Sequence, residues 1–336
     1  MFWLSILVAS VVAVDVIVQC IYVRLVLRIF ETKPPFSVPP VPRDPAAEEV
    51  SFQTRDGITL RGSIHFNGQS VPRGVILFCP ELEGSHWSAS IYARGLLEAG
   101  FKVVAFDFRN QGESESLQGY SPLHWATEFE VEDALSALRF IASRPDLNHL
   151  PLGVMGVSRG STPALIAAAR SERVKAVFCE GAYSTDALLV HFISRWATLY
   201  VPRVFLPLLP MWHIRLTSVL VRWTSQLLRK RPYVVLENWL QLLRNRSVLL
   251  VAGERDNYVH PDVGRHLYRR LDSPRAKLWL VPAAKHNRAR HVAPIEYDRR
   301  ISDFFDSSLD PRETLSNQRP HLKVTGAAIG GDLLLK

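Results

Sequence analysis

The stretch LGVMGVSRGSTPALIAAAR, residues 152–170, decides the fold class of this chain. Its first six residues are apolar or glycine, as in a buried strand, and the residues from Ser161 onward read as a helix. Between them Gly156, Ser158 and Gly160 form G-x-S-x-G. In a strand–turn–helix setting the serine sits on a tight, strained turn, and the glycines leave room for the helix to approach the strand. The pattern predicts Ser158 as a nucleophile raised above a sheet.

Eight short apolar, β-branched runs, this one included, are separated mostly by helix-length segments. They are residues 48–54, 59–67, 74–80, 102–108, 152–158, 174–183, 247–254 and 276–283. A turn-forming stretch separates the first two, which suits an antiparallel hairpin at a sheet edge. The other spacings are typical of an α/β fold, so we predict a mostly parallel eight-stranded sheet with helices on both faces. One helix is expected to bury Val131, Leu135, Leu138 and Ile141 as a stripe.

A serine hydroxyl is a weak nucleophile, so it needs a general base, and a carboxylate must orient that base. Asp256 follows the run at 247–254, and His286 follows the run at 276–283. Functional groups in open α/β sheets collect at the carboxyl ends of the strands, so both side chains should meet Ser158 there. We therefore predict a hydrolytic site built from Ser158, Asp256 and His286.

Other acids and histidines lie near the same strand ends: Glu254, Asp262, His86, His124, His260 and His291. Asp262 is expected to begin a helix as its cap. His260 follows Asp256 too closely to lie opposite it, and His291 adjoins the next helix. His286 is therefore the better candidate for the general base. Asp107, at the end of another strand, is interpreted as a residue that organises its loop by hydrogen bonding.

Acyl transfer also needs hydrogen-bond donors for the charge that develops on the carbonyl oxygen. The backbone N–H of Arg159 qualifies, because it opens the helix after Ser158, where the helix dipole favours negative charge. A second donor is expected after the third strand, at the backbone N–H of Glu81 or Leu82. The Glu81 carboxylate would oppose an oxyanion unless its side chain turns away.

Residues 2–22 are almost wholly apolar and long enough to cross a hydrocarbon layer about 30 Å thick. No Lys or Arg precedes Arg24, which argues against a cleaved signal peptide, so we predict a single transmembrane anchor over residues 1–30. Arg24, Arg28 and Lys33 favour a body on the cytoplasmic side. Asp15 costs roughly 2.5–3.5 kcal/mol within such a span, so it is either a tolerated polar residue or a contact with a partner helix.

The rest of the chain divides by composition. Repeated prolines predict an extended stalk over 31–48, followed by an α/β domain over 49–306. Within that domain, residues from about 184 to 246 lose the strand rhythm and are rich in apolar and aromatic side chains, which predicts a helical cap. Residues 307–336 are polar and without periodicity, so we expect a disordered tail.

From about residue 50 to 306 the chain resembles the α/β-hydrolase family. The resemblance is carried by AFDFRNQGES (105–114), GVSRG (156–160), GERDNYVHP (253–261) and KHNRARHVAP (285–294). It implies the α/β-hydrolase fold and a triad of Ser158, Asp256 and His286. Asn110 replaces a glycine that is usual there, and CPELEG (79–84) stands where members often carry H-G-G or H-G-x-G. Among subgroups, the chain looks most like membrane-anchored lipid or thioester hydrolases.

The formal charge of +8 suits an anionic surface such as phospholipid headgroups, and we find no nucleic-acid motif. Cys20, Cys79 and Cys179 fall in separate apolar runs and predict buried thiols without disulfides. No metal or organic cofactor is expected. The anchor, the apolar cap and the basic surface favour a lipid-like ester or thioester as substrate. A peptidase or amidase, and a catalytically inactive membrane-bound interaction module, stay open as alternatives.

Overall fold

The computed structural model describes residues 2–33, 38–68, 71–200, 204 and 210–310. Among these residues the eight predicted runs all form strands, and the strands join in one sheet. They are β1 (Glu48–Gln53), β2 (Thr59–His65), β3 (Val75–Cys79), β4 (Lys102–Phe106), β5 (Leu152–Val157), β6 (Val174–Glu180), β7 (Ser247–Gly253) and β8 (Ala276–Val281). Their order across the sheet is β1-β2-β4-β3-β5-β6-β7-β8.

The sheet is mostly parallel. From β4 to β8 all neighbouring strands run in the same direction, whereas β2 is antiparallel to β1 and to β4. The β1–β2 pair is the predicted hairpin at the sheet edge. Every residue of β5 is buried, and this strand lies between β3 and β6. The residue that follows β5 therefore emerges in the middle of the carboxyl edge, next to the ends of β3 and β6.

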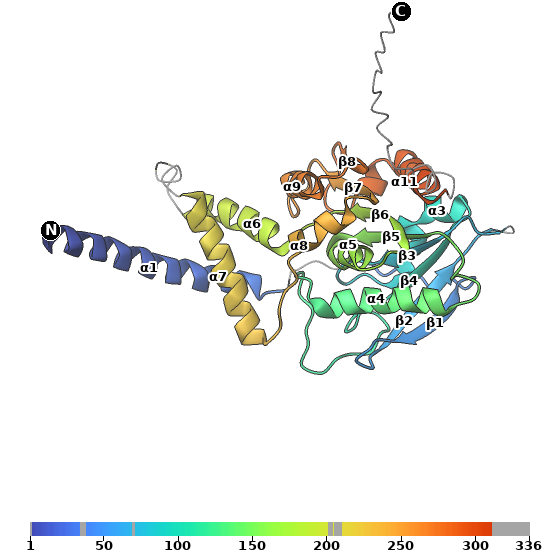
Figure 1. Ribbon diagram of the computed structural model, residues 1–336, viewed down its shortest axis with the longest axis horizontal. Helices are drawn as coiled ribbons and strands as arrows, with labels where there is room; N and C mark the ends of the chain where they lie inside the picture. The colour runs from blue at the N-terminus through green and yellow to red at the C-terminus, as the bar shows by residue number, and fades with distance from the viewer. Residues whose placement is uncertain (1, 34–37, 69–70, 201–203, 205–209, 311–336) are drawn as a thin grey trace, which may run out of the picture.

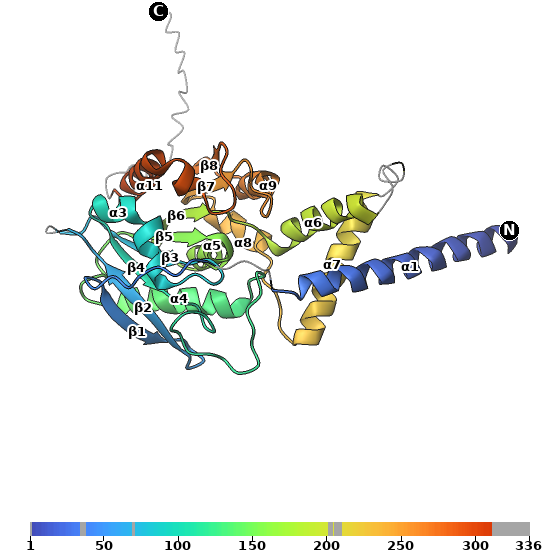
Figure 2. The ribbon, with the colours of Figure 1, turned by 180° about the vertical axis from the view of Figure 1, so that it is seen from behind.

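Helices cover both faces of the sheet (Figures 1 and 2). One face packs against α4 (Glu128–Ser143), α5 (Ser161–Ala169), α8 (Glu237–Leu240) and α9 (Pro261–Leu271). The other packs against α2 (Ala89–Tyr92), α3 (Arg94–Glu98), α10 (Ala289–Val292) and α11 (Pro294–Leu309). The predicted stripe is present on α4, where Val131, Leu138 and Ile141 are buried and Leu135 is partly buried against the same core.

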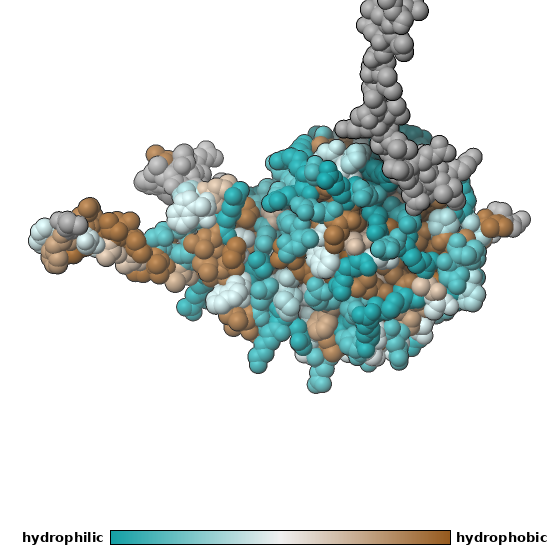
Figure 3. All heavy atoms as spheres, viewed as in Figure 1, coloured by the Kyte–Doolittle hydropathy of each residue, from teal (hydrophilic) through white to brown (hydrophobic). Residues whose placement is uncertain are grey.

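Two long helices between β6 and β7 lie outside these layers and form the helical cap (Figure 1). They are α6 (Thr185–Tyr200) and α7 (Met211–Arg229). Helix α1 (Phe2–Phe30) lies against α7 and projects away from the sheet as an apolar rod (Figures 1 and 3). Within the described ranges it is the one helix long and apolar enough to cross a membrane.

The C-terminal end of α1 is fixed to the body. Phe30 is buried and stacks on Trp125, with 4.5 Å between the ring centroids. The indole Nε1 of Trp125 donates a hydrogen bond to the backbone oxygen of Phe30 at 2.9 Å. Further along, the Asp44 carboxylate contacts Nδ1 of His65 in β2 at 3.3 Å. Where it is described, the predicted stalk therefore lies on the body instead of holding it at a distance; residues 34–37 lie outside the described residues.

Two expectations about the fold need correction. The tail was expected from residue 307, but residues 307–309 continue α11 and Leu309 is buried. The polar residues before Leu309 hide its helical spacing from Phe305; residues 311–336 lie outside the described part of the chain. All three cysteines are free, and Cys79 and Cys179 are buried as predicted, but Cys20 is exposed on α1 because that helix has little protein around it.

Candidate active site

The turn between β5 and α5 holds Ser158 in a strained backbone conformation. Its φ is 49°, a left-handed value that residues other than glycine seldom adopt. The glycines beside it are required by close contacts. A Cβ at Gly156 would lie 2.6 Å from the Cα of Ser161, and one at Gly160 would lie 2.3 Å from the backbone oxygen of Cys79. The tight strand–turn–helix expected from the sequence is therefore present.

The three predicted side chains meet at the carboxyl edge of the sheet. Oγ of Ser158 lies 2.8 Å from Nε2 of His286, and Nδ1 of His286 lies 2.7 Å from Oδ2 of Asp256. The other carboxylate oxygen of Asp256 accepts hydrogen bonds from the backbone N–H groups of Tyr258 and Val259, each at 2.8 Å. This arrangement can move a proton from the serine to the imidazole, while the buried carboxylate fixes the orientation and tautomer of the ring.

Two residues at the end of β6, which no motif marks in the sequence, position the loop that carries His286. The buried Glu180 carboxylate accepts hydrogen bonds from the backbone N–H of Ala289 and from the hydroxyl of Tyr297, both at 2.9 Å. Gly181 has a φ of 64°, and a Cβ there would lie 2.9 Å from Cε1 of His286. The one sequence signal that could have identified these two residues is a glutamate followed by a glycine at the end of an apolar strand.

The alternative acids and bases do not reach Ser158. Glu254 is exposed, and Asp262 opens α9 and pairs with Arg265 at 2.8 Å. His260 caps the same helix, since its ring accepts the backbone N–H of Asp262 at 3.3 Å. His86 contacts Ser63 through Nδ1 at 2.8 Å. Among the described histidines, His286 is the one hydrogen-bonded to Ser158.

Asp107 organises its loop, as predicted. Its carboxylate accepts backbone N–H groups from His86 at 2.6 Å and from Glu113 at 2.8 Å. Asn110, which replaces a glycine in the resembling motif, has a φ of 60° and bonds the backbone N–H of Leu117 at 2.9 Å. Asparagine tolerates this left-handed conformation, so the departure leaves the loop intact.

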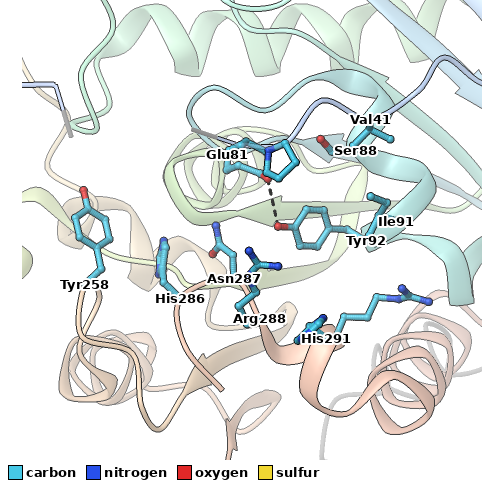
Figure 4. Close-up of a pocket in the computed structure, with 13 residues that line it drawn as sticks. Val41, Glu81, Ser88, Ile91, Tyr92, Tyr258, His286, Asn287, Arg288 and His291 are labelled. Carbon is cyan, nitrogen blue, oxygen red and sulfur yellow. Dashed lines mark hydrogen bonds between the residues drawn. The ribbon is translucent and has the colours of Figure 1, made fainter. Parts of the chain in front are cut away.

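A cavity of about 470 Å³ opens beside His286 (Figure 4). It is lined by Val38, Pro39, Val41, Glu81, Ser88, Ile91, Tyr92, Tyr258, His286, Asn287, Arg288, Arg290 and His291. The lining combines apolar and aromatic surface with a few charged groups, as small-molecule sites do. Part of its wall comes from the described end of the stalk, which the sequence does not predict. Within the described residues, no three His, Cys, Asp or Glu side chains gather as metal ligands would.

The predicted oxyanion donors lie on two segments that touch. Arg159 belongs to η2 (Ser158–Gly160), which leads directly into α5, while Glu81 and Leu82 follow β3. The close approach of Gly160 to Cys79 brings these segments together. The side chain of Arg159 is buried and pairs with the equally buried Glu130 at 2.8 Å. Arg159 can therefore offer its backbone N–H to a substrate while its charge is neutralised inside the body.

Glu81 faces the cavity instead of turning away from it. One carboxyl oxygen accepts the hydroxyl of Tyr92 at 3.2 Å (Figure 4), and the other, Oε2, is buried without a partner among the described residues. Burial raises the pKa of Glu81 to about 7, and the nearby Glu180 acts in the same direction. Below that pH the carboxyl is mostly neutral, which removes the repulsion that a charged glutamate would exert on an oxyanion.

The raised pKa of Glu81 predicts a pH-dependent loss of stability. The unfolded chain releases this proton near pH 4.5, whereas the folded chain keeps it until about pH 7. As pH rises from 4.5 to 7, wild type should therefore lose on the order of 3 kcal/mol of unfolding free energy relative to Glu81→Gln, and the difference should stay constant above pH 7. Urea unfolding of both proteins at pH 5 and pH 8 measures it. Glu83→Gln, at an exposed neighbour, is the control; parallel curves for wild type and Glu81→Gln would contradict the assignment.

Comparison with known proteins finds a match to one protein family and to relatives that align with part of the chain. Residues 74–205 match the family described as alpha/beta hydrolase fold. An uncharacterised protein of Pseudomonas aeruginosa is 32% identical over 146 residues, covering 42% of this chain and 38% of that protein. The thiohydrolase aneE of Aspergillus aculeatus is 29% identical over 140 residues, covering 38% of this chain and 39% of the relative. The chain thus spans about two fifths of the length of these relatives.

A solved structure extends the likeness over most of the chain. The esterase Pf2001 of Pyrococcus furiosus superposes with a TM-score of 0.60 and 19% sequence identity. The superposition covers 83% of this chain and 97% of the esterase. At this level of identity the likeness establishes the fold, while the chemistry has to be argued from the site itself.

Proposed function

We propose that this chain, which has the α/β-hydrolase fold and matches that family's model over residues 74–205, is a membrane-anchored serine hydrolase that cleaves ester or thioester bonds of lipid-like substrates. One observation carries the proposal: Oγ of Ser158 lies 2.8 Å from Nε2 of His286, whose Nδ1 lies 2.7 Å from Asp256. This geometry activates a serine through general-base catalysis. The strained turn at Ser158 and the cavity beside His286 support the same role.

In the proposed reaction Oγ of Ser158 attacks the substrate carbonyl carbon, and its proton passes to Nε2 of His286. The negative charge moves to the carbonyl oxygen, where the backbone N–H of Arg159 and that of Glu81 or Leu82 donate hydrogen bonds. The imidazolium, stabilised by Asp256, protonates the leaving alcohol or thiol as its bond to the acyl carbon breaks. A water molecule that loses a proton to His286 then attacks the acyl carbon, and Ser158 is released with its proton restored.

The choice of an ester or thioester draws on what similar proteins are named: an esterase among the structures and a thiohydrolase among the sequences. The lipid-like character draws on the apolar helix α1 and the apolar cap beside it. We place the body on the cytoplasmic side, because Arg24, Arg28 and Lys33 follow the apolar part of α1.

Labelling with a fluorophosphonate probe tests the proposal on the full-length protein in detergent micelles. Wild type should be labelled, Ser158→Ala should not, and His286→Ala should react far more slowly, because the probe is attacked by the activated serine. Ser143→Ala removes an exposed hydroxyl on α4 and should be labelled like wild type. A folded wild type without label would instead support the inactive interaction module.

Substrate comparison then separates the reaction classes. An ester, a thioester and an amide with the same acyl chain would all be cleaved by the same three side chains. Differences in rate among them therefore report on the leaving group. We expect kcat/KM to be higher for the ester and thioester than for the amide. A preference for the amide would assign the site to a peptidase or amidase.

A further inference from the structure

Helix α1 contacts the cap through polar side chains in the middle of its apolar sequence. The Asp15 carboxylate lies 3.1 Å from Nε2 of His213, and Nε2 of Gln19 donates a hydrogen bond to Oγ1 of Thr217 at 2.9 Å. Near the other end of α1, Glu31 pairs with Arg229. In each case the partner is 198 residues further along the chain. A constant offset means that α1 and α7 run in the same sense, and the two helices cross at an angle (Figure 1).

This alignment sets the depth of α7 in a membrane. Arg24 is the first basic residue of α1, and Asp15 precedes it by nine residues, which is about 14 Å along a helix. With Arg24 at the headgroups, Asp15 lies near the middle of a hydrocarbon core about 30 Å thick. His213 contacts Asp15 directly, so the N-terminal half of α7 lies at the same depth. The contact with His213 also accounts for the carboxylate in α1, because a polar partner lowers its cost there.

The outer face of α7 is mostly apolar, and Arg215 is an exposed charged residue among its apolar side chains. Trp212, Leu216, Val219, Trp223 and Leu227 recur at helical spacing and are each between 39% and 58% exposed. The opposite face of α7 is buried against α6 and α1. In the space-filling view, apolar surface continues from α1 onto the region of α7 (Figure 3). Such a stripe on a soluble surface would be unusual, whereas against acyl chains it needs no further cover.

A second cavity, of about 280 Å³, lies where α1, α6 and α7 meet. Its lining includes Leu25 and Ile29 of α1, Ile193 and Trp196 of α6 and Ile214 of α7. From there a run of ring contacts leads toward the catalytic edge. Trp196 stacks on Phe192 at 5.4 Å, Phe192 meets Tyr258 at 5.7 Å, and Tyr258 meets His286 at 5.1 Å between centroids.

We propose that α7 lies within the phospholipid bilayer beside α1, and that the cavity between α1, α6 and α7 receives the acyl chain of a membrane lipid. The inference rests on the proposed membrane attachment and extends it from an anchor to the cap. A lipid would then reach the site sideways from its leaflet, with its acyl chain along Trp196, Phe192 and Tyr258. Its carbonyl would then come to Ser158, beside His286.

Depth-dependent fluorescence quenching tests the position of α7. The full-length protein with Cys20→Ser, in phosphatidylcholine–phosphatidylglycerol vesicles, is labelled at single cysteines with an environment-sensitive fluorophore; Cys79 and Cys179 are buried. Leu216→Cys should be quenched by brominated lipid, as should Val12→Cys in the apolar part of α1. Leu227→Cys, on the same face but level with Ile29, should be quenched less. Lys175→Cys, exposed at the start of β6, should not be quenched.

The outcomes separate this inference from the proposed function. Quenching at Val12 without quenching at Leu216 would overturn the inference and leave the anchor in place. No quenching at either position would overturn both. A Leu216 probe that is shielded but not quenched by brominated lipid would show a protein surface, such as a second copy of the chain, on this face of α7, and would also overturn the inference.

The cavity is tested by Ala197→Phe, which adds a ring inside it, and by Trp196→Ala, which removes one. We expect each variant to lower, by about tenfold, the ratio of kcat/KM for a long-chain ester in vesicles to that for a soluble short-chain ester. The ratio cancels any loss of folded enzyme, because both substrates report on the same molecules. An unchanged ratio in both variants would overturn the acyl-chain assignment.

Discussion

Replacing Asp256 by asparagine should lower kcat for ester hydrolysis by about 10⁴-fold while the fold is kept. The backbone N–H groups of Tyr258 and Val259 point at Oδ1, so the amide oxygen of the new side chain will stay there. The amide NH₂ then faces Nδ1 of His286 and donates to it. Nδ1 becomes an acceptor, the ring proton moves to Nε2, and the nitrogen beside Ser158 can no longer take the serine proton.

Steady-state kinetics on a soluble ester measure this loss, and thermal unfolding confirms that the variant is folded. Glu254→Gln is the matched control, because Glu254 is an exposed carboxylate two residues away at the end of β7. It should leave kcat unchanged. If Asp256→Asn kept wild-type kcat, or if Glu254→Gln lost as much, Asp256 would not be the residue that orients the base.

Replacing Glu130 by glutamine should destabilise the protein by about 3–5 kcal/mol. Arg159 is buried, and its Nε and Nη1 have no partner among the described residues. Its Nη2 lies 2.8 Å from Glu130. Burial alone would raise the pKa of Glu130, but the charge of Arg159 and the hydrogen bonds from Tyr120 and Thr127 lower it, so the pair is ionised. Neutralising the carboxylate leaves a buried guanidinium without a counter-charge.

Urea unfolding measures this effect. Glu128→Gln is the control, since Glu128 lies in the same helix and pairs with Arg170 at the surface, where an ion pair contributes about 0–1 kcal/mol. Adding Arg159→Met to Glu130→Gln removes the unpaired charge and should restore most of the lost stability. If the double variant were no more stable than Glu130→Gln, the loss would come from the hydrogen bonds to Thr127 and Tyr120 instead.

The strands, the serine turn and the two loops that carry Asp256 and His286 could be predicted from the sequence because their signals are local. A buried strand shows as an apolar run of about six residues, and a tight turn before a helix shows as glycines around a serine. Parallel strands place their carboxyl ends together, so three local signals were enough to predict that Ser158, Asp256 and His286 meet. Another local signal, the turn-forming stretch between β1 and β2, predicted their antiparallel hairpin.

Other features depend on contacts between distant parts of the chain, which no local pattern records. Glu180 and Gly181 position the His286 loop from more than a hundred residues away, and the side chain of Arg159 turns inward only because α4 supplies Glu130. The stalk forms part of the wall of the catalytic cavity, although its prolines indicated a spacer. Asp15 reads in the sequence as a costly charge in an apolar helix, and only the tertiary structure supplies His213 beside it.

By itself the sequence determined the elements and the edge at which they meet, because periodicity and turn chemistry act within a few residues. The tertiary structure decided which buried charges are paired and where the first helix lies, because those depend on packing between segments far apart in the chain.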